Sequence, residues 1–221
     1  MRSRPNLHSP TQGFPMRSSL ARAGALTVAA LLTILSCHDA VTAPESRTTA
    51  ELNLLHVTYD FPKLALTTVS FWAVKGKPAG VDLWYHARPG AIDSAKFVEF
   101  RLAAGALDRR PDGSAIALGD SVQITLTVTD ARHMMIEYQP SGLRFSVAEP
   151  PTLKIFWTAC GDDLNYDGRV DAADDAIASQ LGIWRQEGAG QPWFHLPSVV
   201  VKSNREVRSQ LDGFSGYALS Y

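Results

Sequence analysis

Apolar and polar residues alternate along most of the chain from residue 67 onward, which is the pattern of strands that bury one face. The clearest alternation lies at 120–130, where Val122, Ile124, Leu126 and Val128 are separated by Gln and Thr. Further runs rich in β-branched and aromatic residues predict strands at 67–74, 80–87, 96–102, 133–139, 143–147, 152–158, 193–201, 205–211 and 213–221. Turn sequences separate these runs about every ten residues. The predicted fold class is therefore mainly β, an antiparallel β-sandwich.

One short stretch has helical periodicity instead. Ala173, Ile177 and Leu181 recur at every fourth position, and Gly182 follows as a C-terminal stop. We expect this helix and the acidic loop before it to form an insertion at 160–184, between two late strands of the sandwich.

The N-terminal part of the chain has the layout of a secretory signal. Within 16–37, two arginines precede an uncharged apolar run at 23–35, which ends in Ser36 and Cys37. An apolar run that ends in a small residue and a cysteine resembles a bacterial lipobox. We therefore expect a signal peptide at 1–36 and a lipid on Cys37.

A lipid on Cys37 would anchor the protein to a membrane. Residues 37–66 begin small, polar and Pro-containing, as a tether does, and 67–221 would form the domain. His38 is not the aspartate that signals retention in the inner membrane. The expected location is therefore the bacterial cell envelope, outside the cytoplasm and anchored to the outer membrane.

Several alternatives stay open at this end of the chain. Translation can start at Met16, and an ordinary signal peptide would be cleaved near Ala40 or Ala43. Of the two cysteines, Cys160 has no disulfide partner if Cys37 carries lipid, and we then expect Cys160 to be a small buried residue. A disulfide between the two would instead tie the tether to the domain.

Composition and motifs argue against two classes of function. With 21 Lys and Arg against 22 Asp and Glu, the net charge of -1 gives no bulk attraction to nucleic acid. The six histidines are scattered without a His-Glu-x-x-His pattern, and the chain contains no Gly-x-Ser-x-Gly elbow or phosphate-binding glycine motif. We expect neither a nucleic-acid partner nor an enzyme.

The stretch DLNYDGRVDAAD at 163–174 carries the clearest chemistry of the chain. Calcium binds roughly six to eight oxygens, which a twelve-residue loop supplies from positions 1, 3, 5, 7, 9 and 12. Gly168 stands at position 6, where the backbone must turn sharply, and Val170 at position 8 is expected to anchor the loop. The predicted Ca²⁺ ligands are Asp163, Asn165, Asp167, the Arg169 carbonyl, Asp171 and Asp174.

The pattern resembles an EF-hand loop, except that Asp replaces the longer Glu at position 12. With a strand-like segment before the loop, it is more similar to a dockerin repeat. Dockerins carry two such repeats and this chain has one, so the resemblance implies the ion site and no cohesin-type partner. A plain acidic surface turn is the alternative, because Asp, Asn and Gly all favour turns.

Short motifs, among them PSGLRF and the terminal FSGYA, occur within five longer stretches at 100–108, 119–130, 136–146, 150–157 and 211–221. Together these stretches resemble the ZU-type β-domain of ankyrins, netrin receptors and tight-junction scaffold proteins, and similar domains occur on bacterial lipoproteins. The resemblance would cover 67–221. It implies a β-sandwich used for binding and mechanical coupling.

Some members of that family cut themselves between Phe and Ser of a terminal His-Phe-Ser, with the His as base. This chain has Gly213, Phe214 and Ser215 at the matching positions, so the nucleophile is present and the base is missing. A serine without a positioned base is weakly reactive. We expect no self-cleavage.

These observations predict a calcium-binding lipoprotein of the cell envelope with a structural or binding role, in which the ion stabilises a loop insertion. Its ligand would be a protein or a glycan. The alternative is a carbohydrate-binding or hydrolytic accessory protein with a calcium-shaped site. It would need an exposed platform among the aromatics Trp72, Trp84, Tyr85, Trp157, Trp184 and Trp193, which are more often core residues on alternating strands.

Overall fold

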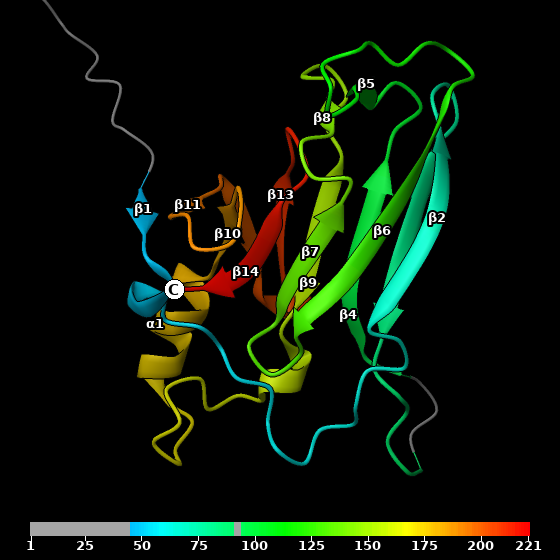
Figure 1. The fold of residues 1–221 in the computed structure, drawn as a ribbon. Helices are drawn as coiled ribbons and strands as arrows, with labels where there is room; N and C mark the ends of the chain where they lie inside the picture. The colour runs from blue at the N-terminus through cyan, green and yellow to red at the C-terminus, as the bar shows by residue number, and fades with distance from the viewer. Residues whose placement is uncertain (1–44, 91–93) are drawn as a thin grey trace, which may run out of the picture. The chain divides into compact units, whose positions relative to one another are not determined.

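The computed structural model describes residues 45–90 and 94–221 (Figure 1). The predicted signal peptide and Cys37 lie outside these residues. The described chain is mainly β with antiparallel pairing throughout, which confirms the predicted fold class. Across 45–90 and 94–221, no helix has both the length and the apolar character needed to cross a bilayer.

The larger sheet has seven strands, and Figure 1 shows the last of them, β14, running between β10 and β7. Their order is β1 (Ser46–Arg47), β11 (Trp193–His195), β10 (Gly182–Gln186), β14 (Gly216–Ser220), β7 (Met135–Gln139), β6 (Ser121–Asp130) and β2 (Thr68–Val74). The smaller sheet has the order β12 (Ser198–Val201), β13 (Glu206–Gln210), β9 (Thr152–Phe156), β4 (Lys96–Leu102) and β3 (Ala79–Trp84).

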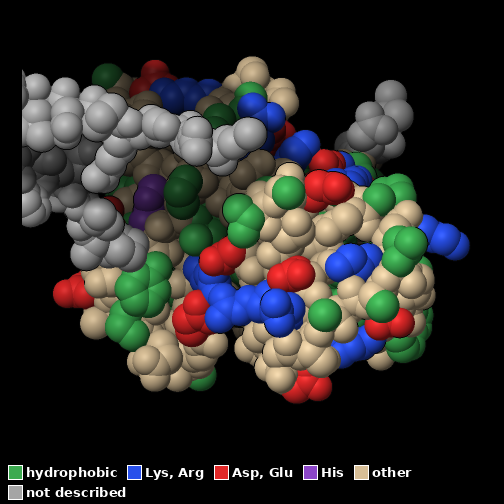
Figure 2. Space-filling model, turned by 90° about the horizontal axis from the view of Figure 1, so that it is seen from above, with side chains coloured by type: hydrophobic (Ala, Val, Ile, Leu, Met, Phe, Trp, Pro, Cys, Tyr) green, Lys and Arg blue, Asp and Glu red, His purple; other side chains and the backbone are tan. Residues whose placement is uncertain are grey.

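Short elements complete the fold. Strands β5 (Leu107–Arg109) and β8 (Arg144–Phe145) pair as a separate ribbon. In the described part of the chain, one α-helix, α1 (Ala172–Gln180), and three 3₁₀ turns, η1 (Thr49–Glu51), η2 (Thr158–Cys160) and η3 (Lys202–Asn204), lie in the connections. Seen from above in Figure 2, basic and acidic side chains lie beside one another, in keeping with the near-zero net charge.

The core lies between the two sheets. Val122, Ile124, Leu126 and Val128 of β6 are buried, as the alternation predicts. An aromatic cluster joins the sheets: the ring of Phe100 on β4 lies 4.9 Å from that of Tyr138 on β7 and 5.5 Å from that of Phe214. Such contacts between large buried rings stabilise the sandwich beyond their area alone.

The segment before β2 belongs to the domain rather than to a tether. Strand β1 pairs with β11, and the Trp193 indole donates a hydrogen bond to Thr49 Oγ1 at 2.9 Å. Leu52, Leu55 and Leu64 are buried. The predicted tether at 37–66 is therefore wrong from residue 45 onward. Its apolar residues follow no strand or helix period, so the sequence pattern did not reveal their burial.

The predicted insertion is also shorter than 160–184. Helix α1 ends at Gln180, and Gly182 is not a helix stop but the first residue of β10, which pairs with both β11 and β14. A side chain at Gly182 would collide with the ring of His195, since an added Cβ would lie 2.1 Å from His195 Nε2. The glycine is needed for close packing between strands, and the loop–helix excursion spans 161–181.

Candidate functional site

The acidic loop, residues 163–174, connects η2 to α1. Its backbone turns at Gly168, which has a φ of +84°, in the left-handed region that favours glycine. The Asp163 carboxylate lies inside this turn and accepts hydrogen bonds from the amides of Asp167, at 3.2 Å, and Gly168, at 2.8 Å. The glycine at position 6 thus makes the turn that the loop pattern predicts.

The next two ligand candidates turn toward the same part of the loop. Asn165 Oδ1 accepts from the Asp167 amide at 3.0 Å, so Asn165 and Asp163 share one donor. Asp167 Oδ1 accepts from the Arg169 amide at 2.9 Å, and its Oδ2 lies 3.3 Å from Asn165 Nδ2. One oxygen each of Asp163 and Asn165 therefore faces the same amide, and Asp167 faces the amide nitrogen of the Asn165 side chain.

Asp174 closes the loop from its far end. Its side chain is buried, with Oδ1 accepting from the amides of Leu164 at 2.6 Å and Asn165 at 3.2 Å. Oδ2 accepts from the Asp171 amide at 2.8 Å, and Asp171 Oδ1 in turn accepts from Ala173 N, which completes a capping box at the start of α1. The Asp171 amide is the main cause that lowers the pKa of Asp174; burial opposes it, and the other two amides add to it. Asp174 is therefore held as an anion.

These contacts decide how well the predicted ligand set fits an ion. The oxygen donors suit calcium. Asp163 and Asn165 accept a hydrogen bond from the same amide of Asp167, and Asp174 accepts hydrogen bonds from the two residues that follow Asp163. Asp171 is engaged as the helix cap. Within 45–90 and 94–221, no three His, Cys, Asp or Glu side chains are grouped tightly enough to hold a metal. The donor chemistry thus fits, while the carboxylates are bonded to backbone amides.

The apolar anchor of the loop is Leu164 rather than Val170. Leu164 is 3% exposed and belongs to the main core, whereas Val170 is 68% exposed. The prediction for Val170 is therefore wrong. The anchor therefore lies at the second position of the loop and not at the eighth, and Asp174 binds its backbone amide.

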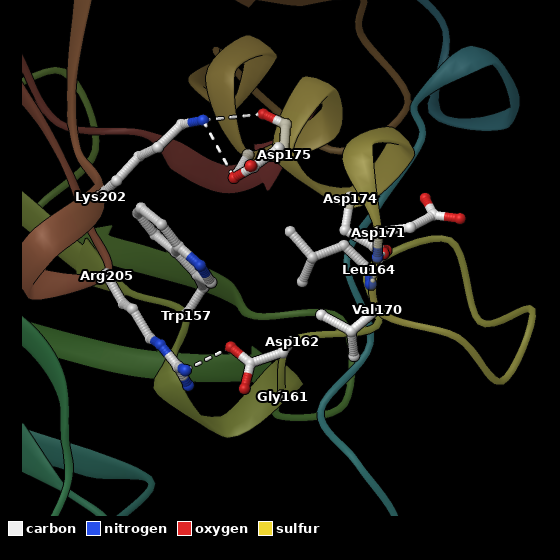
Figure 3. A pocket seen from close by; sticks show the side chains of 11 residues that line it. Trp157, Gly161, Asp162, Leu164, Val170, Asp171, Asp174, Asp175, Lys202 and Arg205 are labelled. Carbon is white, nitrogen blue, oxygen red and sulfur yellow. Dashed lines mark hydrogen bonds and ion pairs between the residues drawn. The ribbon is translucent and has the colours of Figure 1, made fainter.

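A groove of about 320 Å³ lies beside the acidic loop (Figure 3), with Val170 and Leu164 on one side and Lys202 and Arg205 on the other. Lys202 Nζ donates to the Asp175 carbonyl at 2.9 Å, and Arg205 pairs with Asp162. These two contacts bridge the loop–helix excursion to the β12–β13 connection. They hold the excursion to that connection at two separate points along the groove.

A second contact, which the sequence did not indicate, fastens the loop to another part of the domain. The Tyr166 ring stacks on His56 with centroids 5.0 Å apart, and the His56 ring meets His133 edge-on at 4.8 Å. His133 Nδ1 lies 2.6 Å from Asp130 Oδ2 at the β6–β7 turn. The histidines are far apart in the sequence and share no motif, so only the fold brings them together.

The aromatic residues do not assemble into one platform. Tyr85, Trp157, Trp184 and Trp193 are buried, as expected for core residues. Trp72 is 62% exposed on β2 of the larger sheet, and Trp84 is 40% exposed on β3 of the smaller one. Lys96 Nζ lies 4.9 Å from the centroid of the Trp84 ring, which covers that ring with a cation.

Ser215 and Cys160 are both buried. Ser215 Oγ receives a hydrogen bond from Arg185 Nε at 3.0 Å, and a guanidinium cannot accept a proton as a base would. Cys160 Sγ lies 3.4 Å from Met134 Sδ, and burial raises the pKa of its thiol to about 12. Neither side chain lies in a reactive environment.

No family model matches the chain, and neither a curated protein nor a solved structure matches it significantly.

Proposed function

We propose that the chain is a calcium-binding lipoprotein of a bacterial cell envelope, whose ZU-like β-sandwich has a structural or binding role. One observation carries the proposal: the side-chain oxygens of Asp163, Asn165 and Asp167 turn toward the same part of a loop that Asp174 closes. Four carboxylates within twelve residues repel one another, and a cation would relieve this repulsion.

The proposed ligands are Asp163, Asn165, Asp167, the Arg169 carbonyl, Asp171 and Asp174. The ion would supply positive charge to the loop and stabilise the excursion 161–181, with no part in a reaction. The short Asp at position 12 argues for a weak site, with a Kd on the order of 10⁻⁵ to 10⁻³ M. Because Asp174 already binds three backbone amides, its oxygens would be shared between those amides and the ion.

Isothermal calorimetry on the purified protein tests calcium binding directly. We expect one binding event at millimolar calcium, which Asp167→Ala removes. Asp108→Ala is the matched control, because Asp108 lies on β5 outside the loop and should leave the binding heat unchanged. Absence of binding heat in the unaltered protein would show that the loop is a plain acidic turn without a calcium site.

Two further measurements test the rest of the proposal. In a Gram-negative host the protein should take up labelled palmitate and partition into detergent, and Cys37→Ala should lose both properties. A glycan array separates the proposal from the carbohydrate-binding alternative: sugar binding that Trp72→Ala abolishes would favour the alternative.

A further inference from the structure

The outer face of the smaller sheet carries a row of charged side chains. The charges are paired with opposite charges at one end of the row only. The strand register places Val199, Arg208, Lys154, Glu99 and Asp82 side by side across β12, β13, β9, β4 and β3. The row therefore runs from an apolar residue through two cations to two acids.

The two acids are already occupied by cations. Glu99 lies 2.5 Å from Lys96 and 2.9 Å from Lys154, and Asp82 lies 2.7 Å from Arg101. Glu99 is only 15% exposed, so these contacts are partly shielded from solvent. Each acid of the row is thus paired with a cation of the same sheet.

Arg208 is the exception in this row. Across the described residues no acidic side chain lies within ion-pairing distance of Arg208. Its direct neighbour on β9 is Lys154, and like charges placed opposite each other destabilise a sheet. Because Lys154 is paired with Glu99, Arg208 is left as the exposed guanidinium of the row without an acidic partner, which a bound anion would supply.

Arg208 and Lys154 lie in a groove of about 900 Å³, which we call the sheet groove. This volume is in the range of small-molecule sites. Its apolar walls include Val147, which is 94% exposed, and Val199, which is 52% exposed, together with Leu196 and Pro197 from the β11–β12 connection. Because Val199 pairs with Arg208 in the register, an apolar wall begins directly beside the unpaired cation.

The charge of the sheet groove selects the kind of anion. Arg101, Lys154 and Arg208 face it, together with Glu99 and Asp212. Arg101 pairs with Asp82 and Lys154 with Glu99, so that among these described cations Arg208 alone has no acidic partner. Asp212 is itself paired with Arg185. One cation without an acidic partner beside apolar walls matches a monoanion with an aliphatic tail.

We infer that the sheet groove binds an aliphatic monocarboxylate, with the carboxylate on Arg208 and Lys154 and the tail along Val199, Pro197 and Val147. A guanidinium forms two parallel hydrogen bonds to a carboxylate, which fixes the head group. The tail then covers apolar side chains that are now exposed. The sheet groove shares no residue with the acidic loop, so the inference stands apart from calcium binding.

Ligand-detected NMR and calorimetry with three probes test this inference on the purified protein. Sodium decanoate should bind at least tenfold more tightly than acetate, which lacks the tail, or decyltrimethylammonium, which has the opposite charge. Arg208→Gln should weaken decanoate binding about tenfold or more. Arg109→Gln is the control, because Arg109 is exposed on β5 outside the groove and should leave the affinity unchanged.

A second variant separates the tail contact from the head contact. Val199→Asp should weaken decanoate binding while the protein keeps its cooperative unfolding, since Val199 is an exposed residue of an edge strand. Equal binding of decanoate and decyltrimethylammonium, equal binding of decanoate and acetate, or full affinity in Arg208→Gln would overturn the inference.

Discussion

The carboxylate of Asp174 accepts a hydrogen bond from the amide of Leu164 at 2.6 Å, across ten residues of chain. Leu164 is part of the main core, and Asp174 is the third residue of α1 and a member of its capping box. One buried side chain thus fixes the start of the helix to the start of the acidic loop. The loop is held in shape by its own last ligand candidate.

Asp174→Ala should therefore lower the urea midpoint of unfolding in the presence of a calcium chelator. The substitution leaves the amides of Leu164, Asn165 and Asp171 without their acceptor. The adjacent Asp175→Ala is the control: its side chain is 80% exposed and only pairs with Lys202, so the midpoint should barely change. Equal midpoints for the two variants would contradict this role of Asp174.

The same contact predicts a pH dependence. The amide bonds lower the pKa of Asp174 in the folded state, so its contribution to stability is present above the pKa of the unfolded chain and is lost as pH falls through the folded value. The difference in urea midpoint between the unaltered protein and Asp174→Ala should accordingly shrink on acidification. A difference that stays constant down to pH 2 would contradict it.

Removal of residues 45–66 should destabilise the domain. A chain of 45–221 is expected to unfold cooperatively, whereas 67–221 lacks Leu52, Leu55 and Leu64 and uncovers Trp193. Loss of one fully buried leucine, as in Leu55→Ala, costs about 2–5 kcal/mol. Tryptophan fluorescence during thermal unfolding measures both effects. Identical melting curves for the two chains would show that residues 45–66 are a tether and contribute nothing to the stability of the domain.

Glu99 should stabilise the smaller sheet at neutral pH and lose this effect in acid. Burial raises the pKa of Glu99, but hydrogen bonds from Lys96 and Lys154 lower it more, to about 2. The stabilisation is full above the unfolded pKa of about 4.3 and disappears as pH falls toward 2. Glu99→Gln should lower the free energy of unfolding by about 1–3 kcal/mol at pH 7.

Urea denaturation of Glu99→Gln between pH 7 and pH 2 checks this window, because the variant and the unaltered protein should converge at the acid end. Glu45→Gln is the control, because the Glu45 side chain is exposed. Its free energy of unfolding should change by less than about 0.5 kcal/mol at pH 7. A constant difference at all pH values would show that Glu99 acts through packing and not through charge.

The strands could be predicted from the sequence because alternation and burial coincide in them. Strand β4 has the predicted bounds of 96–102, and β6 begins one residue inside its predicted range. Strand β10 was not predicted, because a glycine directly after a helical pattern is typical of a helix end. In the structure Gly182 instead leaves space for His195. The predicted strand at 193–201 is in fact two strands, β11 and β12, which Leu196 and Pro197 separate into different sheets.

The acidic loop shows the same limit at the level of the site. Residue types and spacing predicted the turn at Gly168, because only a glycine readily takes that backbone conformation. They could not predict that Leu164, rather than Val170, anchors the loop, nor that Tyr166 stacks on His56. These contacts depend on which surfaces the fold places beside the loop. The local sequence pattern does not predict those neighbouring surfaces.

The melting temperature of the purified protein with calcium, with magnesium and with a chelator tests the central claim most directly. Calcium should raise the free energy of unfolding by about 2.7 kcal/mol at a hundredfold excess over Kd, because the ion binds the folded form. Magnesium should act weakly, since it prefers octahedral sites and keeps its waters. Asp163→Ala should remain folded and lose the calcium-dependent rise. A melting temperature that calcium leaves unchanged in the unaltered protein would contradict the account.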